Sequence, residues 1–189
     1  MHYLLLIRHS QPEIVADIPA REWQLSEEGR RRCENIIPTV ATYAPVKIVT
    51  SREPKAIETG HIIAERLRMP VYAADNLHEH ERSKVPLLSR DEFTTTVKRF
   101  FDHPNQLVLG DETADQAHIR FDTAIQNLLS HHPAETLAFV AHGTVISLFV
   151  SRHAGVDAFR LWEQLGMPAL LVLSRPEMKL IGNIEGVTV

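Results

Sequence analysis

The sequence predicts an α/β fold, a three-layer sandwich in which helices flank a mixed, mostly parallel central sheet. Short apolar runs of strand length alternate along the chain with longer segments whose apolar residues recur at helical spacing. This alternation is typical of parallel strands joined by helical crossovers. The chain has 189 residues, of which 44% are hydrophobic and 23% charged, as in one ordinary globular domain. We therefore expect a single domain over residues 1–189.

The first half of the chain carries alternating strand and helix signals. The expected elements are a strand at 3–7, a helix from about 26 to 43, a strand at 46–50, a helix from 54 and a short strand at 70–73. The continuous apolar run at 3–7 is typical of a strand covered on both faces. Glu27 and Glu28 suit the first turn of a helix, where the dipole favours negative charge. Pro54 suits the first helical turn, where its missing N–H costs nothing.

The second half continues this pattern and ends in strands. The expected elements are helices at 89–101 and 111–131, a strand at 136–141, a helix at 145–155, and a closing pair of strands at 169–174 and 178–184. The apolar run at 136–141 is a strong strand signal, and Gly155 is a residue that commonly ends a helix. The sequence shows no repeat, linker or low-complexity stretch that would divide the domain.

Composition and charge exclude several classes of function. The net charge is -4 and the pI is about 6.2, so no basic field is expected to hold nucleic acid or an anionic membrane. Cys33 is the single cysteine, so no internal disulfide can form, which favours a reducing compartment. The first apolar run ends at Arg8 and His9, too early for a membrane span or a signal peptide. We expect a cytoplasmic protein.

Polar residues follow three of the expected strands. In open α/β sheets, ligands bind outside the carboxyl ends of the strands. The residues found there are Arg8, His9 and Ser10, then Thr50 and Ser51 with Lys55 one turn further on, then His142 and Gly143. Two histidines and two cations at the starts of helices, whose N-terminal amides favour anions, indicate a pocket for a phosphate-like dianion. The chain contains no GxGxxG or P-loop motif, so we expect no nucleotide cofactor.

Several motifs together resemble the histidine phosphatase (phosphoglycerate mutase-like) superfamily. LIRHSQPE is similar to its opening Arg-His-Gly motif, and FVAHGTVISLF is similar to its late His-Gly motif. In between, LSEEGRRRC, TSREPKAIETG, NLHEHERS and GDETADQAHIRF resemble further family segments in the family's order. The resemblance covers nearly the whole chain, and it implies a phosphoglycerate mutase-like fold and the phosphatase branch of the superfamily.

The resemblance also implies catalytic roles. It makes His9 the nucleophile that becomes phosphohistidine, Arg8 a clamp on phosphate oxygens, and His142 a group that stabilises the transferring phosphoryl group. Glu79 is the implied proton donor, and its neighbour Glu81 is the alternative. This role requires a pKa raised towards neutrality, by burial or by the nearby phosphate.

The chain departs from the family pattern at several phosphate contacts. Lys55 stands where the family has a second arginine, and a lysine cannot form a bidentate fork, so Arg52 is the alternative contact. Ser10 replaces the usual glycine after the first histidine, and it can either donate to phosphate or crowd the site. Gln11 is a substitute contact for an absent asparagine, and Gly143 completes the expected phosphate-binding set.

The resulting functional prediction is a metal-independent phosphomonoester hydrolase without a cofactor, acting on a small phosphomonoester. One alternative is a phospholigand-binding protein with weak or no turnover, and a less favoured one is a phosphoglycerate mutase. Residues 80–111 are expected to form a cap over the site, with Lys84 and Leu87 among its side chains. We interpret the histidine pairs 78/80 and 131/132 as surface residues and expect no metal. The sequence ranks neither substrates nor oligomeric states.

Overall fold

The computed structural model describes residues 1–82, 85 and 88–181. Its centre is a five-stranded sheet with the strand order β3-β2-β4-β1-β5. The strands are β1 (His2–Arg8), β2 (Lys47–Thr50), β3 (Val71–Ala73), β4 (Leu137–Ala141) and β5 (Ala169–Arg175). The neighbouring pairs β3/β2, β2/β4 and β4/β1 are parallel, and β5 is antiparallel to β1. This is the mixed, mostly parallel sheet that the sequence predicts.

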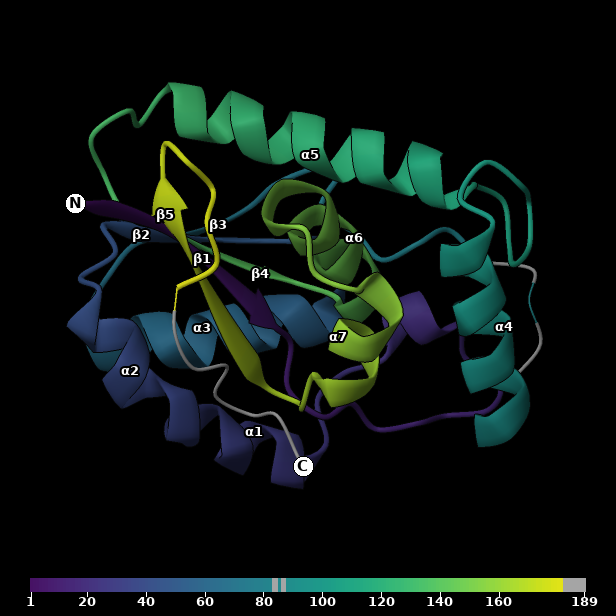
Figure 1. Cartoon of the computed structure of the whole chain (residues 1–189). Helices are drawn as coiled ribbons and strands as arrows, with labels where there is room; N and C mark the ends of the chain where they lie inside the picture. The colour runs from purple at the N-terminus through teal and green to yellow at the C-terminus, as the bar shows by residue number, and fades with distance from the viewer. Residues whose placement is uncertain (83–84, 86–87, 182–189) are drawn as a thin grey trace.

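Helices cover both faces of this sheet (Figure 1). They are α1 (Glu27–Cys33), α2 (Ile37–Thr42), α3 (Pro54–Leu67), α4 (Arg90–Asp102), α5 (Ala114–Ser130), α6 (Gly143–Ala154) and α7 (Ala158–Gln164), with 3-10 turns η1 (Ala20–Glu22) and η2 (Glu34–Ile36). Side chains alternate between the faces along a strand. Leu4 and Leu6 of β1 accordingly pack with the apolar residues of α5 and α6, whereas Leu5 and Ile7 pack with those of α2 and α3. The three-layer prediction is confirmed.

Helix starts in the second half are fixed by capping residues. Ser89 and Thr113 each form a capping box at the start of α4 and α5, in which the cap hydroxyl accepts from a backbone N–H and an acidic or amide side chain binds back. Gly155 ends α6 in the left-handed conformation, with φ 72°, as expected from the sequence.

Two expectations about the elements need correction, and one helix was not expected. The helix expected from 26 to 43 is interrupted by η2, and α2 restarts with Pro38 in its first turn, because proline cannot donate an interior helical hydrogen bond. The final strand expected at 178–184 is reduced, within the described residues, to a bridge between Leu180 and Leu173, and 182–184 lie outside them. Helix α7 was not predicted, and it is capped by the side chain of Asp157.

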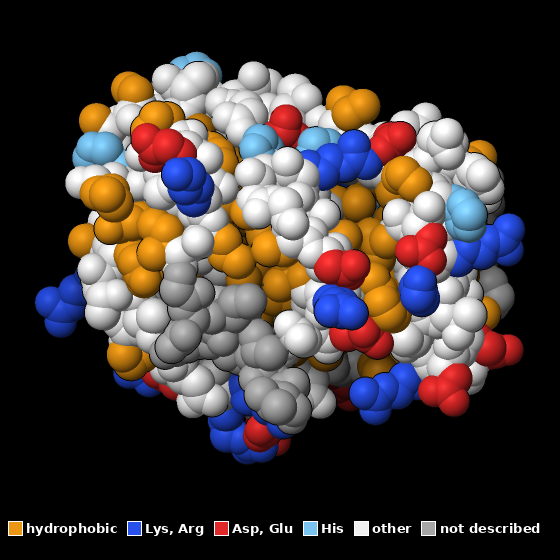
Figure 2. All heavy atoms as spheres, viewed as in Figure 1, with side chains coloured by type: hydrophobic (Ala, Val, Ile, Leu, Met, Phe, Trp, Pro, Cys, Tyr) orange, Lys and Arg blue, Asp and Glu red, His pale blue; other side chains and the backbone are white. Residues whose placement is uncertain are grey.

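The surface and the expected cap complete this description. On the face shown in Figure 2, basic and acidic side chains are interspersed, and no large basic patch is visible there. No helix in the described ranges combines the length and the apolar character that a bilayer crossing requires. The expected cap at 80–111 contains α4, but Lys84 and Leu87 lie outside the described residues, and its role as a cap stays a prediction.

Candidate active site

Two neighbouring strands deliver the two site histidines. In the parallel pair of β1 and β4, Arg8 is in register with Ala141, so the residues that follow them leave the sheet side by side. The backbone N–H of His9 donates to the carbonyl of Ala141 at 2.9 Å, and the rings of His9 and His142 lie 5.1 Å apart between centroids. Both side chains are buried, with 6% and 0% exposed. The predicted meeting of the two histidines is therefore present.

The ring of His9 is held in one tautomer. Its Nδ1 lies 2.7 Å from the carbonyl oxygen of Ser10, and because a carbonyl only accepts, Nδ1 carries the proton. The lone pair is consequently on Nε2. Burial lowers the pKa of His9 well below its ordinary value, and the nearby His142, Lys55 and Arg8 lower it further. The ring is thus a neutral imidazole at pH 7, which is the nucleophilic form.

The ring of His142 is also neutral in the free protein. Burial lowers its pKa well below the ordinary value, and the cation of Lys55 adds to this effect. Its Nε2 lies 2.7 Å from the hydroxyl of Ser51, which follows β2. Its Nδ1 is buried and has no hydrogen-bond partner among the described residues.

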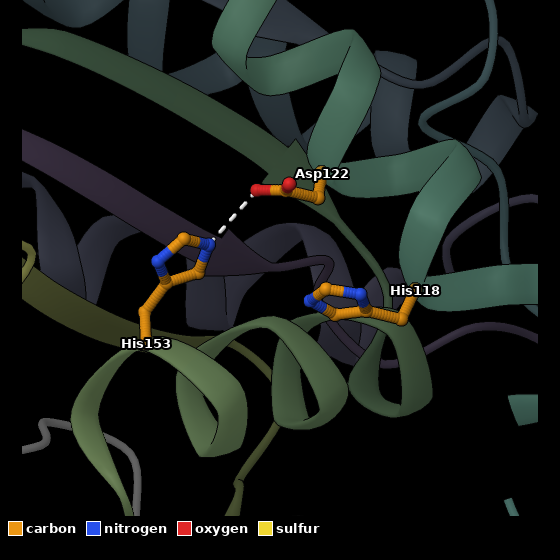
Figure 3. Close-up of side chains that lie close together, drawn as sticks. All are labelled: His118, Asp122 and His153. Atoms are coloured by element: carbon orange, nitrogen blue, oxygen red, sulfur yellow. Dashed lines mark hydrogen bonds and ion pairs between the residues drawn. The ribbon is translucent and has the colours of Figure 1, made fainter. Parts of the chain in front are cut away.

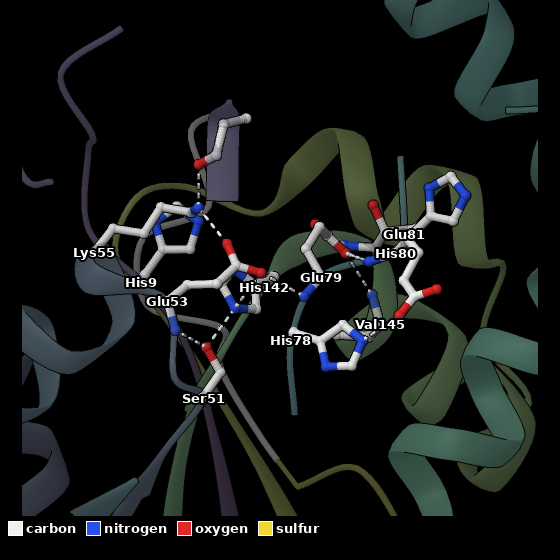
Figure 4. Close-up of polar contacts among 12 residues, drawn as sticks. His9, Ser51, Glu53, Lys55, His78, Glu79, His80, Glu81, His142 and Val145 are labelled. Carbon is white, nitrogen blue, oxygen red and sulfur yellow. Dashed lines mark hydrogen bonds and ion pairs between the residues drawn. The ribbon is translucent and has the colours of Figure 1, made fainter. Parts of the chain in front are cut away.

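A buried ion pair lies beside the histidines (Figure 4). Lys55, in the first turn of α3, donates from Nζ to the carbonyl of Ala20 at 2.7 Å and to the carboxylate of Glu53. The other Glu53 oxygen accepts from the backbone N–H of Glu79 at 2.9 Å and lies 3.5 Å from His142 Nε2. An ammonium group has three protons and Lys55 has two acceptors among the described residues, so within them one proton remains for a ligand.

Arg8 reaches the site along the start of α6. Its Nη1 donates to the carbonyl of Leu165, and its Nε is buried without a partner among the described residues. A Cβ atom on Gly143 would lie 3.1 Å from the Arg8 Cζ, so the absence of a side chain at Gly143 makes room for the guanidinium. Burial lowers the pKa of Arg8, yet arginine remains a cation in proteins.

The carboxylate of Glu79 occupies the N-terminus of α6. It accepts from the backbone N–H groups of Thr144 at 3.2 Å, Val145 at 3.3 Å and His80 at 2.9 Å. Burial raises the pKa of Glu79, but the cation of Arg82 and the amide donors of His80 and Thr144 oppose this effect, and the pKa lies below its ordinary value. Burial alone therefore does not raise this pKa as a proton donor requires, because amides at a helix N-terminus stabilise the ionised form.

The loop that carries Glu79 is anchored by α5. Arg120 of α5 donates to the carbonyls of Asn76, His78 and Glu79 at 3.0, 3.1 and 3.3 Å. It also forms an ion pair with Glu112 at 2.6 Å, and both side chains are nearly buried. One guanidinium thus holds three backbone carbonyls of this loop.

Ser10 and Gln11 contact the start of α1. The Ser10 hydroxyl donates to the carbonyl of Gly29 at 2.6 Å, and the Ser10 N–H donates to the hydroxyl of Thr59 at 3.0 Å. The carbonyl of Gln11 accepts from Ser26 N at 3.0 Å. A Cβ on Gly29 would lie 2.0 Å from that carbonyl oxygen, so only glycine lets these two segments approach this closely.

Arg52 and Glu81 lie on the surface in this structure. Arg52 pairs with Asp75 at 2.5 Å, and both side chains are largely exposed. Glu81 is exposed and its carboxylate lies 3.2 Å from His78 Nε2. The structure therefore brings His9, His142 and Glu79 together, and leaves Arg52 and Glu81 outside this group.

Glu53 and Arg120 are site residues that the sequence analysis did not assign. The sequence contained a signal for Glu53, because a buried lysine needs a counter-charge and Glu53 stands two residues before Lys55. Arg120 lies within the family-like segment GDETADQAHIRF, but its contacts are with a loop more than forty residues earlier in the chain.

This arrangement can be compared with known proteins. The model of the Histidine phosphatase superfamily (branch 1) matches residues 4–176. The chain belongs to this superfamily. Membership of this histidine phosphatase family confirms both the expected superfamily and the expected enzyme class, a phosphatase. No curated protein matches the sequence at a significant level.

Solved structures share the fold of this histidine phosphatase at low sequence identity. A mycobacterial glucosyl-3-phosphoglycerate phosphatase, described in complexes with VO3, has a TM-score of 0.79 at 17% identity, with 100% of both chains covered. The α-ribazole phosphatase from Shigella flexneri has a TM-score of 0.70 at 15% identity, with 99% of this chain and 98% of that chain covered. A phosphoserine phosphatase mutant from Entamoeba histolytica, in complex with phosphoserine, has a TM-score of 0.77 at 15% identity, covering 99% and 96%.

Proposed function

We propose that the protein is a metal-independent phosphomonoester hydrolase that works through a phosphohistidine on Nε2 of His9. The observation that carries the proposal is the tautomer of His9. Its Nδ1 proton is bound by the Ser10 carbonyl, and its low pKa keeps the ring neutral, so Nε2 presents a lone pair beside Arg8 and Lys55. Phosphoryl transfer needs an aligned nucleophile and compensation of charge on the phosphoryl oxygens, and this site supplies both.

The first step transfers the phosphoryl group to the enzyme. Nε2 of His9 forms a bond to phosphorus while the bond between phosphorus and the ester oxygen breaks. Arg8, the remaining proton of Lys55 and the ring of His142 compensate the charge on the equatorial oxygens. Glu79 gives its proton to the leaving oxygen. Because its pKa is low in the free protein, the negative phosphate itself must favour the protonated carboxyl.

The second step regenerates the enzyme. A water molecule forms the new bond to phosphorus, the bond between phosphorus and Nε2 of His9 breaks, and inorganic phosphate leaves. Glu79, ionised after the first step, accepts the proton of the attacking water. The same carboxyl group thus acts as acid and then as base.

Small phosphomonoesters are the proposed substrates. The names of the structural neighbours include a glucosyl-3-phosphoglycerate phosphatase and a phosphoserine phosphatase, whose substrates as named are small phosphorylated molecules. The net charge of -4 gives no support to a nucleic-acid ligand.

The test is phosphate release from a panel of small phosphomonoesters in EDTA, with wild type, His9→Ala and the control His131→Ala, which alters an exposed histidine. We expect EDTA-resistant release that is lost only in His9→Ala, and an acid-labile, base-stable label on the wild-type protein after rapid quenching. Release that persists in His9→Ala would refute the phosphohistidine route.

Binding of phosphate or vanadate without any turnover would instead support a phospholigand-binding protein, an alternative favoured by the contact between Lys55 and Glu53. Isomerisation that depends on a bisphosphate primer would indicate a mutase.

A further inference from the structure

A second group of polar side chains lies between α5 and α6, away from the residues assigned above (Figure 3). His118 and Asp122 are one helical turn apart on α5, and His153 stands near the end of α6. One ligand atom from each residue lies within 4.8 Å of the other two. We propose that His118, Asp122 and His153 bind a divalent transition-metal ion such as Zn²⁺.

The chemistry of the three side chains fits such an ion. Two imidazole nitrogens and one carboxylate oxygen form a common ligand set for Zn²⁺, whereas Mg²⁺ and Ca²⁺ prefer oxygen ligands alone. Residues four apart on a helix present their side chains on one face, so His118 and Asp122 can reach the same ion. A water molecule would complete a four-coordinate site, because all three side chains are partly exposed.

The unpartnered nitrogen of His118 is an independent observation that points to a ligand. Its Nε2 is buried and has no hydrogen-bond partner among the described residues, and in Figure 3 the ring extends towards His153. Buried polar atoms are usually paired, so an unpaired ring nitrogen in this position calls for an occupant. A metal ion bound to this nitrogen would supply that partner.

The other two ligands are already held in place. The Nε2 of His153 lies 2.8 Å from Asp122 Oδ1, and the His153 ring packs on Phe149 with centroids 4.3 Å apart. Gln126 donates to the same Asp122 oxygen at 3.2 Å. Atoms that share a tetrahedral ion at about 2.0 Å lie about 3.3 Å apart, so the three ligand atoms, which lie within 4.8 Å of one another, would close on the ion by side-chain rotation.

An ion at this position would join the two helices that frame the proton donor. Helix α6 begins with the amides that bind the Glu79 carboxylate, and α5 carries Arg120, which binds the loop of Glu79. The ion would therefore stabilise the fold, and it lies outside the chemistry proposed for His9. Its binding is testable whether or not the protein hydrolyses phosphomonoesters.

The test is metal binding by EDTA-stripped, dialysed full-length protein. We expect Co²⁺ to give one equivalent of a visible tetrahedral absorption band that Zn²⁺ displaces, and Zn²⁺ in large excess over its dissociation constant to raise the Tm by about 5 °C or more. His118→Ala, His153→Ala and Asp122→Asn should each weaken binding at least about tenfold, whereas the control His61→Ala, an exposed histidine on α3, should not.

For each variant, the Tm with Zn²⁺ is compared with the Tm of the same variant without metal. Loss of the His153–Asp122 ion pair lowers both values, so it does not affect their difference. Circular dichroism checks that each variant is folded. Absence of the Co²⁺ band in wild type, or a band of full intensity in both His118→Ala and His153→Ala, would overturn the proposal.

Discussion

The carboxylate of Glu53 contacts the ammonium group of Lys55 inside the site, and both side chains are buried. Glu53 also accepts a hydrogen bond from the backbone N–H of Glu79 and lies 3.5 Å from His142 Nε2. Its negative charge therefore lies close to the groups that we propose bind the phosphoryl group. Lysine is a flexible point charge, and this contact together with the Ala20 carbonyl fixes its direction. Glu53 therefore orients Lys55 and, at the same time, opposes an incoming anion.

This dual effect predicts a split phenotype for Glu53→Gln. Removing the negative charge should tighten inhibition by inorganic phosphate about tenfold, since one like charge near the anion is worth about 1.4 kcal/mol. The kcat should fall, because Lys55 loses the contact that orients it. Steady-state kinetics with phosphate as inhibitor measure both changes. Glu58→Gln, which alters a carboxylate paired with Arg30 on the protein surface, is the control. Unchanged phosphate inhibition in Glu53→Gln would contradict this account.

Glu79→Gln should lower kcat strongly and, because it also removes a negative charge near the phosphate, should tighten inhibition by inorganic phosphate. The loss should reach about 100-fold or more for alkyl phosphates, as is usual for a general acid, and should be smaller for p-nitrophenyl phosphate, whose leaving group needs no proton. Glu81→Gln is the matched control, since Glu81 is exposed and pairs only with His78 among the described residues. If Glu81→Gln shows the larger, leaving-group-dependent loss, the proton donor is Glu81.

The low pKa values of the two site histidines predict that stability falls with acidification. Between their folded pKa and about 6.5, the unfolded chain binds protons that the folded chain does not, so the free energy of unfolding falls as the pH drops below about 6.5. Each histidine contributes a slope of up to about 1.4 kcal/mol per pH unit. Urea unfolding from pH 7.5 to 5 should therefore show a shallower slope for His142→Gln than for wild type. Parallel curves for these two proteins, with His131→Gln as control, would rule out this linkage.

Arg120→Met should loosen the loop that positions Glu79. The variant leaves the Glu112 carboxylate buried without its ion-pair partner and three carbonyls without a donor, so we expect a loss of about 3 kcal/mol in the free energy of unfolding and a lower kcat. Arg66→Met, which removes an exposed pair with Glu34, should cost less than about 1 kcal/mol. Equal losses of stability in both variants, measured by urea unfolding, would show that Arg120 does not anchor the loop.

Much of the sheet and its two histidines could be predicted from the sequence. Strands buried on both faces have continuous apolar runs, and the residues that follow parallel strands meet at one edge of the sheet. The first rule depends only on neighbouring residues and the second only on the order of the strands, and together they were enough to place His9 beside His142. The expectation of one continuous helix from 26 to 43 was wrong, because Pro38 lacks the backbone N–H that an interior helical hydrogen bond needs. The spacing of apolar residues does not reveal this restriction.

Other parts of the site depend on contacts that sequence does not reveal. Glu53 stands two residues before Lys55 in the sequence, but its burial and its contacts with Lys55 and with the backbone of Glu79 appear only in the fold. The amides at the start of α6 lower the pKa of Glu79, whereas burial alone suggested the opposite direction. Helix α7 has seven residues, too few to give a clear periodic signal.

The sheet order also has a consequence for how the chain is synthesised. The first described strand, β1, pairs on one edge with β4 and on the other with β5, the last two strands of the described chain. A nascent polypeptide on the ribosome therefore holds β1 without β4 until residues 137–141 have emerged, and without β5 until residues 169–175 have emerged. Until β4 and His142 have been made, His9 has no second histidine beside it, so the pair of site histidines can form only after the crossover from β1 to β4 has been synthesised.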